Sequence, residues 1–205
     1  MLFTYWPGAD ALNPFAVALA ALIADALFGD LRRRAQWLPR PRRWLHSLAV
    51  VFRDRLNRPN RSSGDLAGRG RLVLLGLVAF AALMGAGLAW LAVLLPGAAL
   101  LEVVLVAAFL RQGGLFRQLQ GVARGMTTGA PSKGDTHAMA RQAVEAAADG
   151  YASRVILPTL LYLLIGMPGL WAGAALGALV QVGQPGESFT ASARAVHAML
   201  VAVPA

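Results

Sequence analysis

Uncharged apolar stretches recur along the chain and predict its architecture. Residues 72–95 carry no charged side chain, and a helix of that length, at 1.5 Å per residue, can cross the ~30 Å hydrocarbon core of a bilayer. Residues 12–28 form a shorter apolar stretch that includes an Asn-Pro pair, which suits the start of a helix. Residues 98–110 are apolar apart from Glu102 and follow a Pro-Gly turn. They predict the returning helix of a tight hairpin.

The last apolar stretch, residues 155–182, is interrupted by Met167-Pro168-Gly169. A proline there predicts either one kinked span or two half-spans joined within the membrane. Gly169, Gly173 and Gly177 then recur every four residues, a small-residue stripe that lets helices approach closely. Together the stretches predict an all-α, polytopic membrane helix bundle with about four or five membrane helices.

Positive charge is concentrated in two segments between these stretches. Residues 31–71 hold twelve arginines against two aspartates, and residues 111–154 hold six basic against three acidic residues. Under the positive-inside rule both segments are cytoplasmic loops, and the N-terminus lies outside. We therefore expect a multi-pass protein of a bacterial inner membrane, with its chemistry at the cytoplasmic face. Its basic loops are expected to meet anionic lipid.

Two amphipathic patterns add helices to this plan. Apolar residues within 43–56 fall on one helical stripe, and a basic amphipathic helix beside a span is typical of the membrane interface. Residues 189–203 show a second such stripe, and a further helix is predicted from about His137 to Ala148. Residues 57–70, rich in Pro, Asn, Ser, Gly and Arg, are predicted to be a solvated linker.

Composition narrows the class of protein. Only 14% of the 205 residues are charged and 57% are hydrophobic, whereas a soluble domain carries about 25% charged residues. The net charge of +9 would suggest nucleic acid in a soluble protein, but in so apolar a chain it marks cytoplasmic loops, so no nucleic-acid partner is expected. The absence of cysteine excludes disulfides, thiol catalysis and Cys-ligated zinc. No P-loop, dinucleotide fingerprint or HExxH motif occurs, and the metal ligands stay unknown.

Carboxylates inside the apolar stretches are the first candidates for chemistry. An ionised acid at the membrane centre costs at least ~2.5–3.5 kcal/mol, so such residues usually face a polar pathway or a partner. Asp25 lies near the cytoplasmic end of the first stretch, followed by Asp30, and Glu102 lies inside the third. For Asp25, a functional role and pairing with one of the arginines 32–34 are both open.

An ordered series of motifs resembles the adenosylcobinamide-phosphate synthase family, CobD/CbiB. Its members open with an apolar helix reading LLLD…GDP, then WLPHPV and a helix ending ERRLNR. The matching segments here are ADALFGD at 24–30, WLPRP at 37–41 and RDRLNR at 53–58. Further along, GDT at 134–136 and AVE at 143–145 resemble the family's GRDT and AVES motifs, and 189–205 resembles its helix ending in an IPA-like sequence.

The resemblance implies a membrane enzyme of vitamin B12 (cobalamin) synthesis. Such an enzyme is a C–N ligase that uses ATP and Mg²⁺ to join an aminopropanol unit, usually phosphorylated, to a carboxylate of the corrinoid adenosylcobyric acid. The positions matching the motifs suggest Asp135, Glu145 and Asp149 as catalytic residues. Asp25, Asp30, Thr136 and Arg141 are the expected substrate-binding residues, with Arg42 and Arg43 as further anion-binding candidates. The chain is also expected to be able to form homo-oligomers.

Departures from the family pattern keep an alternative open. Arg40 stands where the family has the histidine of WLPHP, and Gly150, Ser153 and Arg154 replace polar residues of a segment reading AEN..DG. The hydrophobic architecture is kept while polar positions change. The alternative is a catalytically degenerate paralogue, or an inner-membrane signalling or accessory protein like AmpE, a more distantly similar family.

Overall fold

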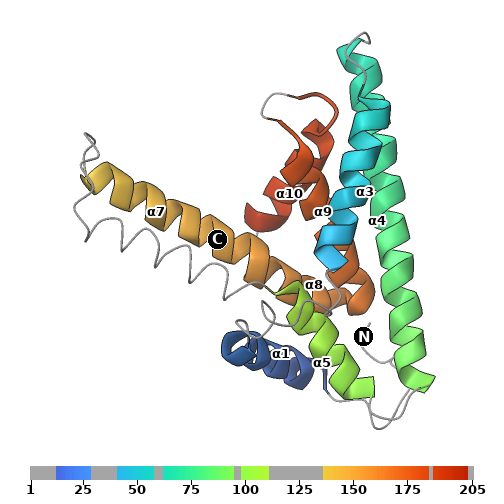
Figure 1. Ribbon diagram of the computed structural model, residues 1–205, viewed down its shortest axis with the longest axis vertical. Helices are drawn as coiled ribbons and strands as arrows, with labels where there is room; N and C mark the ends of the chain where they lie inside the picture. Colours follow the sequence, from blue (N-terminus) through green and yellow to red (C-terminus); the bar gives the residue numbers. More distant parts are fainter. Residues whose placement is uncertain are drawn as a thin grey trace.

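The computed structural model describes residues 13–28, 41–57, 62–94, 98–110, 136–184 and 187–202. These ranges contain helices, turns and no strand, which confirms the all-α prediction (Figure 1). In chain order the elements are α1 (Pro14–Phe28), α3 (Pro41–Leu56), α4 (Ser63–Leu94), α5 (Ala98–Phe109), α7 (Thr136–Tyr151), the π-helix η1 (Ala152–Ile156), α8 (Leu157–Ile165), α9 (Met167–Val182) and α10 (Ala191–Ala202).

Helix α9 is the centre of the bundle. Nine of its sixteen residues are buried, because it packs against α4, α3 and α8 at once. Small side chains make this possible: Gly85 of α4 lies so close to the start of α9 that an added Cβ would sit 2.6 Å from the carbonyl oxygen of Met167. A second group, formed by α1 on α5 and α8, completes the core.

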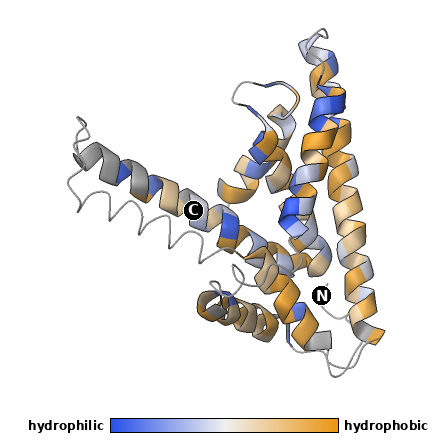
Figure 2. Cartoon of the chain, in the orientation of Figure 1, coloured by the Kyte–Doolittle hydropathy of each residue, from blue (hydrophilic) through white to orange (hydrophobic). Residues whose placement is uncertain are grey.

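Helix α4 is long and apolar on its outer surface. Leu72, Leu83 and Trp90 are each about 70% exposed. Only 28% of the most hydrophobic 18-residue stretch of the helix is buried inside the structure. A core helix of a soluble protein would be mostly covered. Residues 63–92 and 144–165 are the two described stretches of helix long and apolar enough to cross a membrane. Figure 2 shows hydrophobic residues along most of the length of α4.

The predicted linker at 57–70 is partly wrong, because α4 begins at Ser63 rather than near Leu72. The hydroxyl of Ser62 accepts a hydrogen bond from the backbone N–H of Asp65, which caps the helix. Gly70 is buried, and its Cα lies against the backbone of Phe189 just before α10. Packing against the α10 segment therefore extends the helix into a sequence whose composition favours a loop.

Helix α3 also differs from its prediction as an interfacial helix. It runs alongside α4 and packs on α9 instead of lying across the spanning helices (Figure 1). Leu45 and Ala49 are fully buried, whereas Trp44, Val51 and Phe52 of the same predicted stripe stay exposed. The apolar stripe is therefore divided between a contact with α9 and an outer surface.

The alternatives for residues 155–182 are resolved as two helices with a sharp turn between them. Gly166 separates α8 from α9 with φ 79° and ψ −154°, a conformation open essentially only to glycine. The chain turns back on itself, so Gly169 lies against the backbone of Leu161 and Gly173 against its side chain. The expected glycine stripe is confirmed for these two positions, but Gly177 faces open space.

Candidate functional site

Four of the predicted site residues lie on one helix, α7. Arg141, Glu145 and Asp149 are spaced four residues apart, so they share one face of the helix. Arg141 Nε and Glu145 Oε1 are 3.2 Å apart, in an ion pair whose side chains are both largely exposed. Thr136 is the first residue of α7. The side chains of Thr136 and Asp149 lie outside the described part of the structure.

Helix α7 projects away from the bundle (Figure 1). It continues directly into the π-helix η1, which falls on the family-like segment at 149–158. The cause is local: Pro158 has no N–H to donate to the helix, and the N–H of Leu157 bonds to the carbonyl of Ala152, five residues back. Arg154, within this turn, is half-buried. π-turns of this kind are often found at functional sites.

Of the other predicted site residues, those that the structure describes lie on α1 and α3. Asp25 is buried on α1, which packs on α5 and α8. Arg42 and Arg43 lie at the start of α3, Arg42 half-buried and Arg43 exposed. Asp30 and Asp135 fall outside the described residues. The predicted catalytic set therefore remains a prediction, with Glu145 as its member whose side chain is described.

Glu102 has the partner that an acid inside the bundle requires. The hydroxyl of Tyr162 on α8 donates a hydrogen bond to Glu102 Oε1 at 2.7 Å. Tyr162 is 2% exposed, and about two helical turns beyond Glu102 on α5 the ring of Phe109 packs edge-on against Trp171 of α9 at 5.1 Å. The hydrogen bond between Glu102 and Tyr162 thus joins α5 to α8 within an aromatic part of the core. The sequence pointed to Glu102 but gave no reason to choose Tyr162.

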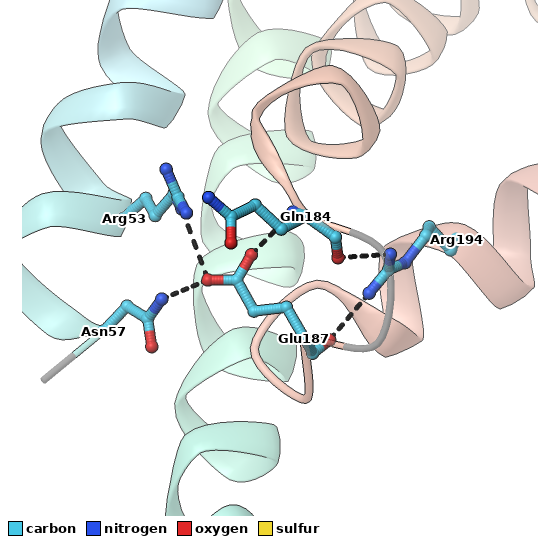
Figure 3. A network of polar contacts seen from close by, with 5 residues as sticks. All are labelled: Arg53, Asn57, Gln184, Glu187 and Arg194. Atoms are coloured by element: carbon cyan, nitrogen blue, oxygen red, sulfur yellow. Dashed lines mark hydrogen bonds and ion pairs between the residues drawn. The ribbon is translucent and has the colours of Figure 1, made fainter. Parts of the chain in front are cut away.

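A second polar cluster, which we call the Glu187 clamp, lies where α3 ends beside the turn between α9 and α10 (Figure 3). It comprises Arg53, Asn57, Gln184, Glu187 and Arg194. Glu187 Oε1 accepts hydrogen bonds from Arg53 Nε at 3.3 Å and from the Asn57 amide, and Oε2 accepts one from the backbone N–H of Gln184 at 2.8 Å. Arg194 donates to the backbone carbonyls of Gln184 and Glu187.

This arrangement uses Glu187 to hold three segments together. Both carboxylate oxygens are already hydrogen-bonded, and the side chain is only 13% exposed. Arg53 pairs with the carboxylate of Glu187, and Arg194 holds the backbone of the same turn through its two carbonyl contacts. Arg53 and Asn57 belong to the RDRLNR segment that carries the family resemblance, whereas Glu187 lies outside the motifs that carry it. Sequence reasoning therefore missed the clamp.

The described side chains do not assemble a metal site. Within the ranges that the structure describes, no group of three or more His, Asp or Glu residues comes together. Glu102 and Glu187 are each bonded to donors of the protein, and Glu145 pairs with Arg141. The described residues thus do not by themselves fit Mg²⁺, which takes oxygen ligands in near-octahedral geometry, and we derive no step through it.

Comparison with curated proteins supports the family resemblance. Proteins named Cobalamin biosynthesis protein CobD match from a Sinorhizobium species, at 33% identity over 74% of this chain, and from Sinorhizobium fredii, at 31% over 79%. The chain is a divergent relative of the CobD proteins. A third CobD protein, from Rhizobium meliloti, matches at 30% identity over 76% of the chain.

The match to CobD covers more of this chain than of its relatives. The chain spans about half the length of the curated CobD proteins, from 52% to 54%. No family profile matches the sequence, and no solved structure matches it. The CobD resemblance therefore rests on sequence identity at 30–33%.

Proposed function

We propose that this chain is a membrane protein that acts in cobalamin biosynthesis on a corrinoid substrate. The observation that carries the proposal is its identity of 30–33% with three CobD proteins over about three quarters of its length. The exposed apolar surface of α4 supports the membrane location.

In its finer form, the proposed reaction is a C–N ligation. An aminopropanol unit, usually phosphorylated, would be joined to a corrinoid carboxylate with ATP supplying the activation. The shared face of α7 supports this assignment, because Arg141 and Glu145 place a cation and a carboxylate one turn apart, and Asp149 follows one turn further along the sequence. A guanidinium can stabilise phosphate charge, and carboxylates can hold or move a proton near the amine.

The experiment is complementation of a bacterial host that lacks its own adenosylcobinamide-phosphate synthase. Growth is measured on a medium that requires cobalamin, with cobyric acid supplied. We expect rescue by the chain, and loss of rescue with Glu145→Ala or Asp135→Ala at equal membrane expression. Asp54→Ala is the matched control, because Asp54 is an exposed acid on α3 outside the proposed site.

The second candidate is a catalytically degenerate paralogue, or a signalling or accessory protein like AmpE. A specific observation favours it: the acids at 102 and 187 serve as hydrogen-bond acceptors within the bundle, and Gly150, Ser153 and Arg154 occupy a segment that is polar in the family. Failure of a well-expressed, membrane-inserted chain to rescue growth would favour this candidate. Rescue that survives both alanine substitutions would instead move the site away from α7.

A further inference from the structure

The polar face of α3, defined by Arg43, His46 and Ser47, lies beside an apolar part of α4. All three residues are exposed. Trp44 of the same helix packs against Phe80 of α4, with 5.8 Å between the ring centroids. Phe80 is nine residues beyond Arg71, the last charged residue of α4, which places it about 13 Å into the apolar stretch at 1.5 Å per residue. Arg43 adjoins Trp44 and therefore lies at a similar depth.

Two contacts fix the level of α3 against α4 independently of Trp44. At the far end of α3, Arg53 pairs with Glu187, and two residues beyond Glu187 the backbone of Phe189 lies against Gly70 of α4. The end of α3 is thus level with the start of the apolar stretch, and the beginning of α3 lies deeper. Figure 2 shows hydrophilic segments of α3 beside the hydrophobic length of α4.

Exposed polar groups at that depth cannot face lipid cheaply. An arginine near the centre of a bilayer costs at least ~2.5–3.5 kcal/mol, and such residues face water-filled space or a polar partner. On this face α3 carries Arg43 and His46 but no acid, and α9, against which it packs, carries no charged residue. The acid of α5, which also contacts α3, is Glu102, and it is bonded to Tyr162. Among the described residues, Arg43 therefore gives this face a positive charge.

From this juxtaposition we infer that water and small water-soluble anions reach the polar face of α3 from the basic side, down to the level of Phe80. This face is distinct from the proposed reaction site on α7, and the inference holds whether or not the chain is a ligase. It assigns α3 a role as the cationic wall of an aqueous access path inside the membrane layer.

The chain has no cysteine, so single cysteines report accessibility directly. Ser47→Cys places a thiol on the polar face. Leu75→Cys is the matched control, because Leu75 is 66% exposed on the lipid-facing side of α4 and no deeper in the apolar stretch. Ser63→Cys, on the exposed first turn of α4, is the reference for full exposure. The purified full chain, in nanodiscs of neutral phosphatidylcholine, is treated with the membrane-impermeant anionic and cationic methanethiosulfonates MTSES and MTSET.

We expect Ser47→Cys to react within about tenfold of the exposed reference, and Leu75→Cys at least about a hundredfold more slowly, because thiolates react only where water reaches them. The anionic reagent should be favoured at Ser47→Cys by about fivefold relative to the reference, and Arg43→Gln should reduce that preference. His46→Cys, tested in parallel, replaces Ser47→Cys if the latter does not fold.

Three outcomes would overturn the inference. Slow labelling of Ser47→Cys and His46→Cys in folded protein, equal to Leu75→Cys, would mean that lipid or another chain covers the face. Fast labelling without charge preference would admit water but refute an anion path. Labelling that stops when one third of the lipid is anionic phosphatidylglycerol would assign the positive face to lipid headgroups instead of soluble anions.

Discussion

Glu187→Gln is expected to loosen the joint between α3 and the α9–α10 turn. The substitution keeps the size of the side chain but removes its charge. It also places an NH₂ group where an oxygen accepts hydrogen bonds, so one of the present donors at Arg53, Asn57 or the Gln184 backbone faces another donor. The ion pair with Arg53 is lost in the same step.

The magnitude follows from the exposure of the pair. Hydrogen bonds to charged groups contribute about 1.5–3 kcal/mol each, and breaking a fully buried pair costs about 3–5 kcal/mol. Arg53 and Glu187 retain 25% and 13% exposure, so water compensates in part, and about 2–4 kcal/mol is expected. For a domain of 150–250 residues this corresponds to a fall in melting temperature of about 5–15 °C.

The assay is thermal unfolding of the purified chain in detergent, followed by circular dichroism. Glu145→Gln is the control, because it removes an ion pair of the i,i+4 type whose side chains are 82% and 64% exposed. Such a pair contributes about 0.3–0.5 kcal/mol. The melting temperature of the Glu145→Gln variant should therefore change by less than about 2 °C. A shift at Glu187→Gln no larger than at Glu145→Gln would refute the assignment of the clamp as a structural joint.

Three further outcomes are expected in the same melting assay. Gly85→Ala should destabilise the chain, because the new Cβ would lie 2.6 Å from a backbone oxygen of α9. The control Gly87→Ala, whose new Cβ meets no neighbour, should be neutral or stabilising by about 0.5–1 kcal/mol. Equal melting temperatures of the two variants would contradict the close approach of α4 and α9. Tyr162→Phe should cost about 1.5–3 kcal/mol, because it deprives a carboxylate on α5 of its donor; an unchanged melting temperature would mean that water replaces the hydroxyl. Burial lowers the pKa of His197, so the unfolded chain binds more protons and stability should fall as pH drops through about 6.5. His197→Gln should flatten this dependence, and His46→Gln is the control. An identical pH profile in the two variants would contradict the role of His197.

The helices could be read from the sequence where apolar runs are long, and the joints between them could not. The apolar composition of residues 98–110 and 155–182 was enough to predict helices there, because a helix in the bilayer needs a continuous apolar surface. The start of α4 at Ser63 was missed, because the composition of 57–70 favours a loop, whereas in the structure Gly70 lies in a helix against the backbone of Phe189. Local composition carries no information about that contact.

The polar partners were hidden for the same reason. Glu102 attracted attention because an acid is costly in an apolar run, but its donor, Tyr162, lies sixty residues away. Glu187 lies 134 residues from Arg53, outside the motifs that carry the family resemblance. A spacing rule can place residues on one helix face, as for Arg141 and Glu145, but it cannot pair residues from different helices.

The π-helix at 152–156 determines the direction in which α7 presents its acids. An α-helix advances about 100° with each residue, and the wider turn of η1 accommodates one residue beyond the regular repeat. Regular α-helical bonding through the same residues would rotate α7 by about 100° about its axis relative to α8, and Glu145 would then face another side. Deleting one residue within η1 would instead restore the regular repeat and leave the faces of α7 and α8 in register, because the π-turn already absorbs that residue. The extra residue at the base of α7 therefore sets the direction of the whole face.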